Sequence, residues 1–235
     1  NISRKIVSSL QNAGEQQVIE VGPGTGVLTK YLLEQYSRFT AFDVDQESIK
    51  YLMNAYPDHA SKFLQKDFLQ HSFDSQSVVI GNFPYNISSQ IFFKIWENKN
   101  NVTEVVGMIQ KEVAERIASK HGTKQYGILS VLLQAFYDIE LLFAVPPSVF
   151  NPPPKVDSAV IRLMRNTATD LGCDVKLFKK LVKAGFGKRR KTLRNALKEF
   201  HIETNENAFF DKRAEQLSVE NFISLTKFVE KQCPK

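Results

Sequence analysis

Residues 16–36 read QQVIEVGPGTGVLTKYLLEQY, and this stretch decides the fold. Residues 16–21 form a short β-branched run typical of a buried strand, and residues 27–36 have the apolar spacing of a helix. Between them, GPGTG places Gly22, Gly24 and Gly26 at the tip of the strand. Glycines there allow positive φ and let a ligand approach the backbone closely. The stretch therefore predicts a strand–loop–helix unit with a binding crevice at its tip, as in α/β proteins that bind nucleotides.

The glycine loop is not the dinucleotide-binding fingerprint. Pro23 and a G-x-G-x-G spacing stand where that fingerprint has G-x-G-x-x-G. The alternative to a binding loop is a plain tight turn between strand and helix, and the loop alone does not decide between the two.

Strand and helix patterns alternate up to Arg165, and only helical patterns follow. This alternation predicts an α/β fold with a doubly wound, mostly parallel sheet, an antiparallel pair near its end and a small C-terminal all-helical domain. The predicted domains are residues 1–167 and 168–235. Strands are expected at 16–21, 39–44, 62–67, 77–82, 103–110, 137–145 and 158–165, and helices at 2–13, 27–36, 46–56, 88–98, 111–119, 128–136, 175–186, 190–200 and 219–231.

The net charge of +6 lies in the C-terminal part of the chain. Residues 1–165 are neutral, whereas residues 166–235 hold 15 basic and 9 acidic side chains. The segment KAGFGKRRKTLRNALK, residues 183–198, has seven basic residues and no acidic one. Such a run is either a solvated helix face or a surface that contacts phosphates.

Composition argues against several other classes of protein. The two cysteines, Cys173 and Cys233, are far apart and the four histidines are scattered, so we expect neither a disulfide framework nor a metal site. No run of 18 apolar residues and no signal peptide occurs, so we expect a cytoplasmic protein without a membrane partner. Because the chain does not begin with Met, we expect it to be part of a longer protein.

Two further strands end in carboxylates. Asp43 ends the second predicted strand and Asp67 the third. An acid about twenty residues after the glycine loop can accept hydrogen bonds from a ribose diol, and the next could accept from the exocyclic amine of adenine. Either acid could instead cap a helix or face solvent, but their order on successive strands favours a nucleoside site.

The fourth strand leads into Asn82, Phe83, Pro84 and Tyr85. An amide oxygen on Asn82 and the carbonyl of Pro84 can accept both N–H bonds of a planar amine and so favour a more tetrahedral nitrogen as positive charge develops. Proline fixes φ, which holds that carbonyl in place. Tyr85 offers a stacking face for a base. The alternative is a proline turn with two core aromatics.

On these residues the chain resembles S-adenosylmethionine-dependent amino-methyltransferases. More narrowly, it is similar to the ribosomal RNA adenine dimethyltransferases, which dimethylate two adjacent adenosines near the 3′ end of small-subunit ribosomal RNA. The resemblance covers nearly the whole chain and rests on NFPYNISSQIFFK, MIQKEVAERI, YGILSVLLQAF, VPPSVFNPPPKVDSAVIRL and GFGKRRKTLRNAL. It implies a Rossmann-like methyltransferase sheet, S-adenosylmethionine as cofactor, and the immature small ribosomal subunit as partner of a monomeric enzyme.

The resemblance also assigns roles to residues. It implies cofactor binding by Gly22, Gly24, Asp43, Asp67 and Asn82, with Asp43 where the family more often has Glu. It implies target-base contacts by Asn82, Pro84, Tyr85 and Phe150, and RNA binding by Lys188, Arg189, Arg190, Lys191 and Arg194. Phe83 stands where the family usually has Leu, and a family segment that helps to close over the cofactor is absent before Asn1.

Three other functions remain open on these patterns. One is the related antibiotic-resistance branch, which methylates a large-subunit adenosine. Another is a protein-glutamine methyltransferase, whose Asn-Pro-Pro-Tyr also grips a planar amide, although the basic helical part argues against it. The third is a ribosome assembly factor that binds RNA without catalysis.

Overall fold

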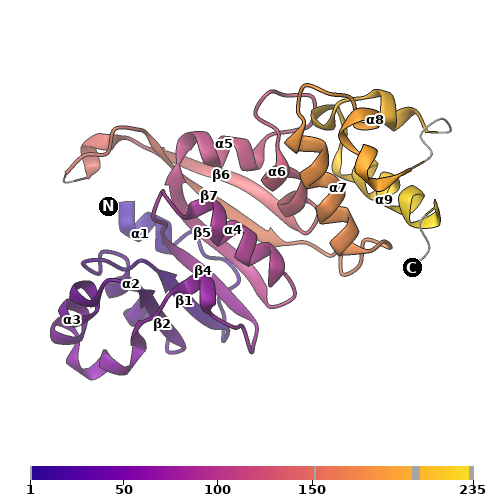
Figure 1. The fold of residues 1–235 in the computed structure, drawn as a ribbon. Coiled ribbons are helices and arrows are strands. Elements are labelled where there is room, and N and C mark those ends of the chain that lie inside the picture. Colours follow the sequence, from indigo (N-terminus) through magenta and orange to yellow (C-terminus); the bar gives the residue numbers. More distant parts are fainter. Residues whose placement is uncertain (1, 151, 203–206, 233–235) are drawn as a thin grey trace. The chain divides into compact units, whose positions relative to one another are not determined.

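The computed structural model describes residues 2–150, 152–202 and 207–232, which form two compact units (Figure 1). The first unit comprises Asn1–Ala114 and Asp138–Arg165, and the second comprises Glu115–Tyr137 and Asn166–Lys235. The predicted division had placed residues 115–137 in the first domain. They belong to the second unit because helix α6 (Ile128–Gln134) packs against helices α7 (Val175–Gly187) and α9 (Val219–Gln232).

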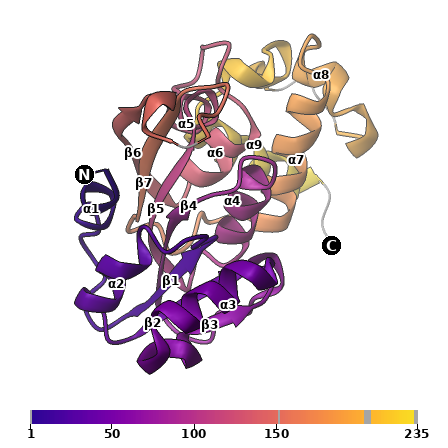
Figure 2. The ribbon, with the colours of Figure 1, turned by 90° about the vertical axis from the view of Figure 1, so that its left-hand side faces the viewer.

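The first unit contains a seven-stranded sheet in the order β3-β2-β1-β4-β5-β7-β6, which Figure 2 shows from β3 and β2 near the bottom to β6 near the top. The paired strands from β3 to β5 are parallel, and β7 is antiparallel to β5. This confirms the predicted fold class. The strands are β1 Gln17–Val21, β2 Phe39–Asp43, β3 Phe63–Gln65, β4 Ser77–Asn82, β5 Val102–Gln110, β6 Tyr137–Val145 and β7 Ser158–Arg165.

Helices cover both faces of this sheet. The helices between β1, β2 and β3 pack in one core cluster against one face. The usual right-handed crossover puts the helix between β4 and β5 on the other face, because the strand order reverses at β4. The helices of the first unit are α1 Ile2–Val7, α2 Thr29–Gln35, α3 Gln46–Ala55 and α4 Ser88–Glu97; α5, Lys111–Ala118, leads into the second unit, which also contains α8, Leu193–Ala196. Short 3-10 turns lie at Pro57–Lys62, Phe68–Gln70, Pro147–Val149, Lys198–Phe200, Ala208–Asp211 and Ala214–Gln216.

Two predicted helices are shorter than their apolar patterns indicated. The helix expected at 2–13 ends at Val7, because the backbone N–H groups of Gln11 and Asn12 donate to the carboxylate of Glu104 instead of to helical carbonyls. The helix expected at 190–200 is reduced to α8. Thr192 before it has extended backbone dihedrals, with ψ at 158°. Tertiary hydrogen bonds thus decide where α1 ends, and local backbone geometry decides where α8 begins.

Phe83, directly after β4, packs its ring against the sheet. Gly81 and Gly107 are register partners on β4 and β5, and a Cβ on Gly107 would lie 2.5 Å from Cε2 of Phe83. The Phe83 ring is fully buried and meets Phe92 edge-on, with ring centroids 5.9 Å apart. Gly81 and Gly107 thus make room for the Phe83 ring. The family that the chain resembles usually has Leu at this position.

Replacing Gly107 by Ala should therefore destabilise the fold by about 1–3 kcal/mol, because the added methyl group meets a packed ring. Gly187→Ala is the matched control, since a Cβ there meets nothing within 4 Å. Urea unfolding measures both variants. Phe83→Leu in the Gly107→Ala background should recover part of the loss, and an equal unfolding midpoint for Gly107→Ala and wild type would contradict this packing.

Candidate active site

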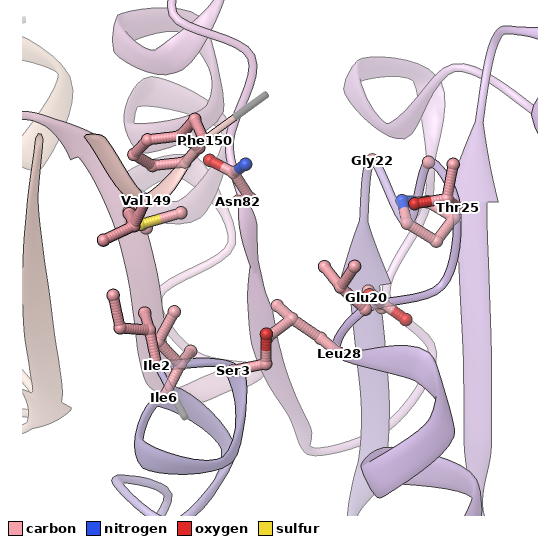
Figure 3. A pocket seen from close by; sticks show the side chains of 14 residues that line it. Ile2, Ser3, Ile6, Glu20, Gly22, Thr25, Leu28, Asn82, Val149 and Phe150 are labelled. Carbon is pink, nitrogen blue, oxygen red and sulfur yellow. The ribbon is translucent and has the colours of Figure 1, made fainter. Parts of the chain in front are cut away.

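A pocket of about 630 Å³ opens at the carboxyl edge of the sheet. Its wall combines α1, the glycine loop and the ends of β4 and β5, and Figure 3 shows the amide of Asn82 next to the ring of Phe150. A second hollow of about 370 Å³ adjoins it and is also lined by Asn82 and Phe150. The larger pocket is lined by Ile2, Ser3, Ile6, Glu20, Gly22, Pro23, Gly24, Thr25, Val27, Leu28, Asn82, Met108, Val149 and Phe150.

The glycine loop presents its backbone to this pocket. Gly22 and Gly24 have φ of 68° and 52°, a region that favours glycine. A Cβ on Gly22 would lie 3.5 Å from Cδ of Pro84, so the loop packs against the segment that follows β4. At Gly24 a Cβ would meet nothing within 4 Å, so this part of the loop is open to a ligand. A loop that lines a pocket of this size favours the binding loop over a plain turn.

Hydrogen bonds fix the residues after β4. The backbone N–H of Phe83 donates to the Met108 carbonyl at 3.0 Å, which anchors the chain directly after Asn82. The hydroxyls of Tyr85 and Ser158 lie 2.6 Å apart, so Tyr85 is tied to the start of β7. The carbonyl of Pro84 accepts from the N–H of Ile87 at 3.1 Å, which leaves its second lone pair for another donor.

The smaller hollow is walled by aromatic rings and prolines. Its lining residues come from the segment after β4 and from the segment before β7: Asn82, Phe83, Pro84, Tyr85, Phe150, Pro152, Pro153 and Pro154. Tyr85 and Phe150 are half-buried, so each keeps part of its ring accessible. The structure thus brings together the four residues predicted to contact a target base.

The two strand-end acids lie on the same edge of the sheet but do not line the larger pocket. Asp43 ends β2, and its register partner Gln65 precedes Asp67 by two residues. One oxygen of Asp43 accepts from the N–H of Asp45 at 3.0 Å, and one of Asp67 caps a 3-10 turn through Leu69 at 2.9 Å. Asp67 thus has the capping role considered as the alternative, whereas Asp43 bonds the backbone ahead of α3, whose cap is Asp45. Each acid keeps a second oxygen for a ligand.

The predicted RNA-binding residues all lie in the second unit, after α7. Lys188, Arg189, Arg190 and Lys191 are exposed. Arg194 is half-buried and forms an ion pair with Asp211, with Nη2 2.8 Å from Oδ1. Residues 188–191 therefore form a turn that leaves α7, whereas Lys183 of the same basic run is exposed on α7 itself and Arg194 lies on α8.

Glu20 is a pocket residue that the sequence patterns did not single out. It is 1% exposed, lines the larger pocket and accepts a 2.7 Å hydrogen bond from the Thr29 hydroxyl. Burial raises the pKa of its carboxyl to about 8, a rise that Thr29 opposes and nearby Asp43 reinforces. The available signal was an acid inside the apolar run VIEV, since a charged residue in a central buried strand is rare without a partner or a function.

Glu104 is a second buried acid that the patterns did not reveal. Its side chain accepts from the N–H of Gln11 at 3.0 Å and from that of Asn12 at 2.7 Å, and burial raises its pKa. Arg162 donates to the Ser9 carbonyl at 3.0 Å. Both side chains hold the segment that follows α1, and Ile2, Ser3 and Ile6 of α1 itself line the larger pocket. No local sequence signal marks these contacts, because they join residues more than 90 positions apart.

Comparison with known proteins places the chain. The family model described as ribosomal RNA adenine dimethylase matches residues 1–231. A ribosomal RNA small subunit methyltransferase A of Cytophaga hutchinsonii is 53% identical, over 97% of this chain and 92% of the relative. The crystal structure of a dimethyladenosine transferase from Plasmodium falciparum superposes with a TM-score of 0.83 at 25% identity, covering 98% of this chain and 96% of that one. The 23S rRNA methyltransferase ErmE shares the fold at 20% identity and a TM-score of 0.72, covering 96% of this chain and 97% of that one.

The fold and the site define an S-adenosylmethionine-dependent methyltransferase. Within that class, the chain belongs to the ribosomal RNA adenine dimethylase family.

The residues present fit the cofactor of this class. The larger pocket falls within the volume range of small-molecule sites, and its open backbone at Gly24 admits a ligand. From Asp67 beyond β3 to Asn82 on β4, three strand spacings span about 14 Å, which suits an elongated ligand. In the parts of the chain that the structure describes, no His, Cys, Asp and Glu side chains form a metal-binding cluster, and no helix could cross a membrane.

Glu20→Gln should flatten the pH dependence of stability between about pH 5 and 8. The unfolded chain releases this proton near 4.5 and the folded state only near 8, so stability is full below the lower value and falls as the pH rises toward the upper one. One such group contributes at most about 1.4 kcal/mol per pH unit. Urea unfolding across this range, with exposed Glu34→Gln on α2 as control, measures the slope, and equal slopes for Glu20→Gln and wild type would contradict the assignment.

Glu104→Gln should weaken S-adenosylmethionine binding about tenfold, because an amide NH₂ then faces a backbone N–H that the carboxylate had satisfied. Titration calorimetry measures the dissociation constant. Glu34→Gln is the matched control, since Glu34 is exposed on α2 and lies outside the side chains that hold the segment after α1. Unchanged cofactor affinity in Glu104→Gln would show that α1 is held in other ways.

Proposed function

We propose that the chain transfers methyl groups from S-adenosylmethionine to N6 of two adjacent adenosines near the 3′ end of small-subunit ribosomal RNA. Its proposed substrate is the immature small subunit, in the cytoplasm, and it acts as a monomer. One observation carries the proposal: Asn82 and Phe150 line both the cofactor-sized pocket and the aromatic hollow beside it. A base in the hollow would thus meet the cofactor pocket at a shared wall.

Asn82 and Pro84 orient the target amine in this proposal. The exocyclic nitrogen of adenine is a poor nucleophile because its lone pair is delocalised into the ring. The Asn82 amide oxygen and the remaining lone pair of the Pro84 carbonyl would accept its two N–H bonds and favour a tetrahedral nitrogen as it becomes positive. The glycine loop supports this geometry, because Gly22 packs against Pro84.

Tyr85 and Phe150 hold the target adenine after it has left the base stack of the RNA. A flipped base is commonly stacked between aromatic side chains, and both rings border the smaller hollow. The hydrogen bond between Tyr85 and Ser158 keeps the Tyr85 ring from rotating away and leaves its face available.

No side chain needs to act as a general base at the amine. S-adenosylmethionine, when bound, supplies an electrophilic methyl group on a positively charged sulfur. The nitrogen that receives a methyl group becomes cationic and acidic, so its proton can pass to solvent afterwards. Asn82 accepts a hydrogen bond throughout and takes up no charge, consistent with an amide at this position.

Two alternatives are weaker. The relative of Cytophaga hutchinsonii that is 53% identical is named for the small subunit, whereas the 23S enzyme is only 20% identical and shows the fold alone. A protein-glutamine methyltransferase does not explain the exposed basic run after α7.

The site assignment is tested by tritium transfer from labelled S-adenosylmethionine to small ribosomal subunits that lack the modification. Asn82→Ala should lower the rate by about 10²–10³, the usual cost of removing one preorganised polar group. Tyr85→Ala should also lose most activity. Tyr85→Phe, which keeps the ring and loses only the hydrogen bond to Ser158, should retain more activity than Tyr85→Ala. Full activity in Asn82→Ala and Tyr85→Ala would refute this mechanism.

The same assay separates catalysis from assembly-factor binding. If the wild-type chain binds small subunits tightly and transfers no label, the proposed reaction is wrong and the binding role stands. Label recovered in the large subunit instead would support the antibiotic-resistance alternative.

A further inference from the structure

The 119–125 loop, SKHGTKQ, links α5 to α6 within the second unit and is exposed along nearly its whole length. Two hydrogen bonds nevertheless anchor its backbone. The Thr123 hydroxyl donates to the Lys120 carbonyl at 2.9 Å, and the Gly122 N–H donates to the Glu215 carbonyl at 2.6 Å. The side chains of Lys120 and Lys124 are therefore presented from an ordered support.

This loop lies beside the end of α7. The guanidinium of Arg189 donates to the carbonyls of Lys124 and Tyr126, the latter at 3.4 Å. The ring of Tyr126, at the end of the loop, meets that of Phe186 with centroids 6.0 Å apart. Residues about 65 positions apart in the sequence therefore form one continuous surface.

The surface has a marked excess of positive charge. The loop contributes Lys120 and Lys124, and the adjoining turn contributes the four exposed basic residues 188–191. Two acidic residues adjoin the loop: Glu215, whose backbone carbonyl accepts from Gly122, and Glu220, whose pKa is lowered chiefly by its hydrogen bond to Ser218, with a smaller contribution from His121. Like charges held this close repel one another, so the cluster does not stabilise the free protein. The same charges favour binding of a polyanionic partner.

We propose that the 119–125 loop is a second part of the ribosomal RNA-binding surface, with Lys120 and Lys124 neutralising phosphates next to those met by residues 188–191. The inference rests on the proposed function and extends it to residues outside the C-terminal run. Arg189 has a double role, because it joins the two segments through backbone carbonyls while adding its own charge.

The other end of α7 offers a matched control. Lys176 and Lys180 are also exposed lysines four residues apart, on the same unit. They border a hollow that contains the carboxylates of Asp174 and Glu230. The 13 residues of α7 separate them from the basic turn by up to about 20 Å. Reversing these two charges changes the net charge equally but leaves the proposed surface intact.

The test compares Lys120→Glu/Lys124→Glu with Lys176→Glu/Lys180→Glu and with reversal of residues 188–191. Filter binding to a labelled transcript of the 3′ part of small-subunit ribosomal RNA is measured between about 50 and 300 mM KCl. The loop variant should bind about tenfold more weakly at low salt and flatten the slope of log affinity against log salt by about 1.5–2, which is two phosphate contacts. The control variant should lose much less.

Circular dichroism melting and S-adenosylmethionine titration establish that each variant is folded and retains its cofactor site. A loop variant that binds like wild type, or that loses no more than the control variant, would overturn the inference. That result leaves the proposed function intact if wild type still methylates small subunits. Failure of wild-type transfer, in contrast, refutes the proposed reaction whatever the loop variant does.

Discussion

The parallel pairing of β1 with β4 is the interaction on which the site depends. It runs from Gln17 opposite Ser77 to Glu20 opposite Ile80, and it brings the ends of two strands about sixty residues apart to adjacent positions. Only because of this register does the glycine loop pack on Pro84. The buried Phe83 ring packs on Gly107 and so fixes where the chain leaves the sheet after Asn82. Packing within the core therefore determines the position of the reactive groups.

Two buried carboxylates serve the same pocket by different physical means. Glu20 is desolvated within the sheet, and its raised pKa makes the neutral acid the stable form near neutral pH. Glu104 accepts backbone N–H groups, which compensate for part of its burial. Glu20 thus gives the pocket a polar but largely uncharged surface, and Glu104 holds the segment after α1, the helix that lines the pocket.

The sequence predicted the parts of the site that follow from strand order. The carboxyl ends of parallel strands share one edge, so alternation alone predicted Gly22, Asp43 and Asn82 at that edge. It could not show that Gly22 and Asn82 line the larger pocket while Asp43 does not. It could not reveal that α1 stops at Val7, because that depends on Glu104, some 90 residues away. Nor could apolar patterns assign residues 115–137 to the second unit, because a helix pattern shows that a face is buried but not which neighbour buries it.

The hydrogen bond between Tyr85 and Ser158 has a consequence for the aromatic hollow. Phe150 precedes Ser158 by eight residues, and the stretch between includes Pro152, Pro153 and Pro154, whose rings restrict φ. Tyr85 is thus tied through its hydroxyl to Ser158, at the end of the chain segment that begins with Phe150. The separation of the two rings across the smaller hollow therefore depends on chain length, so a one-residue insertion within 155–157 would change it and leave every residue that lines the hollow the same.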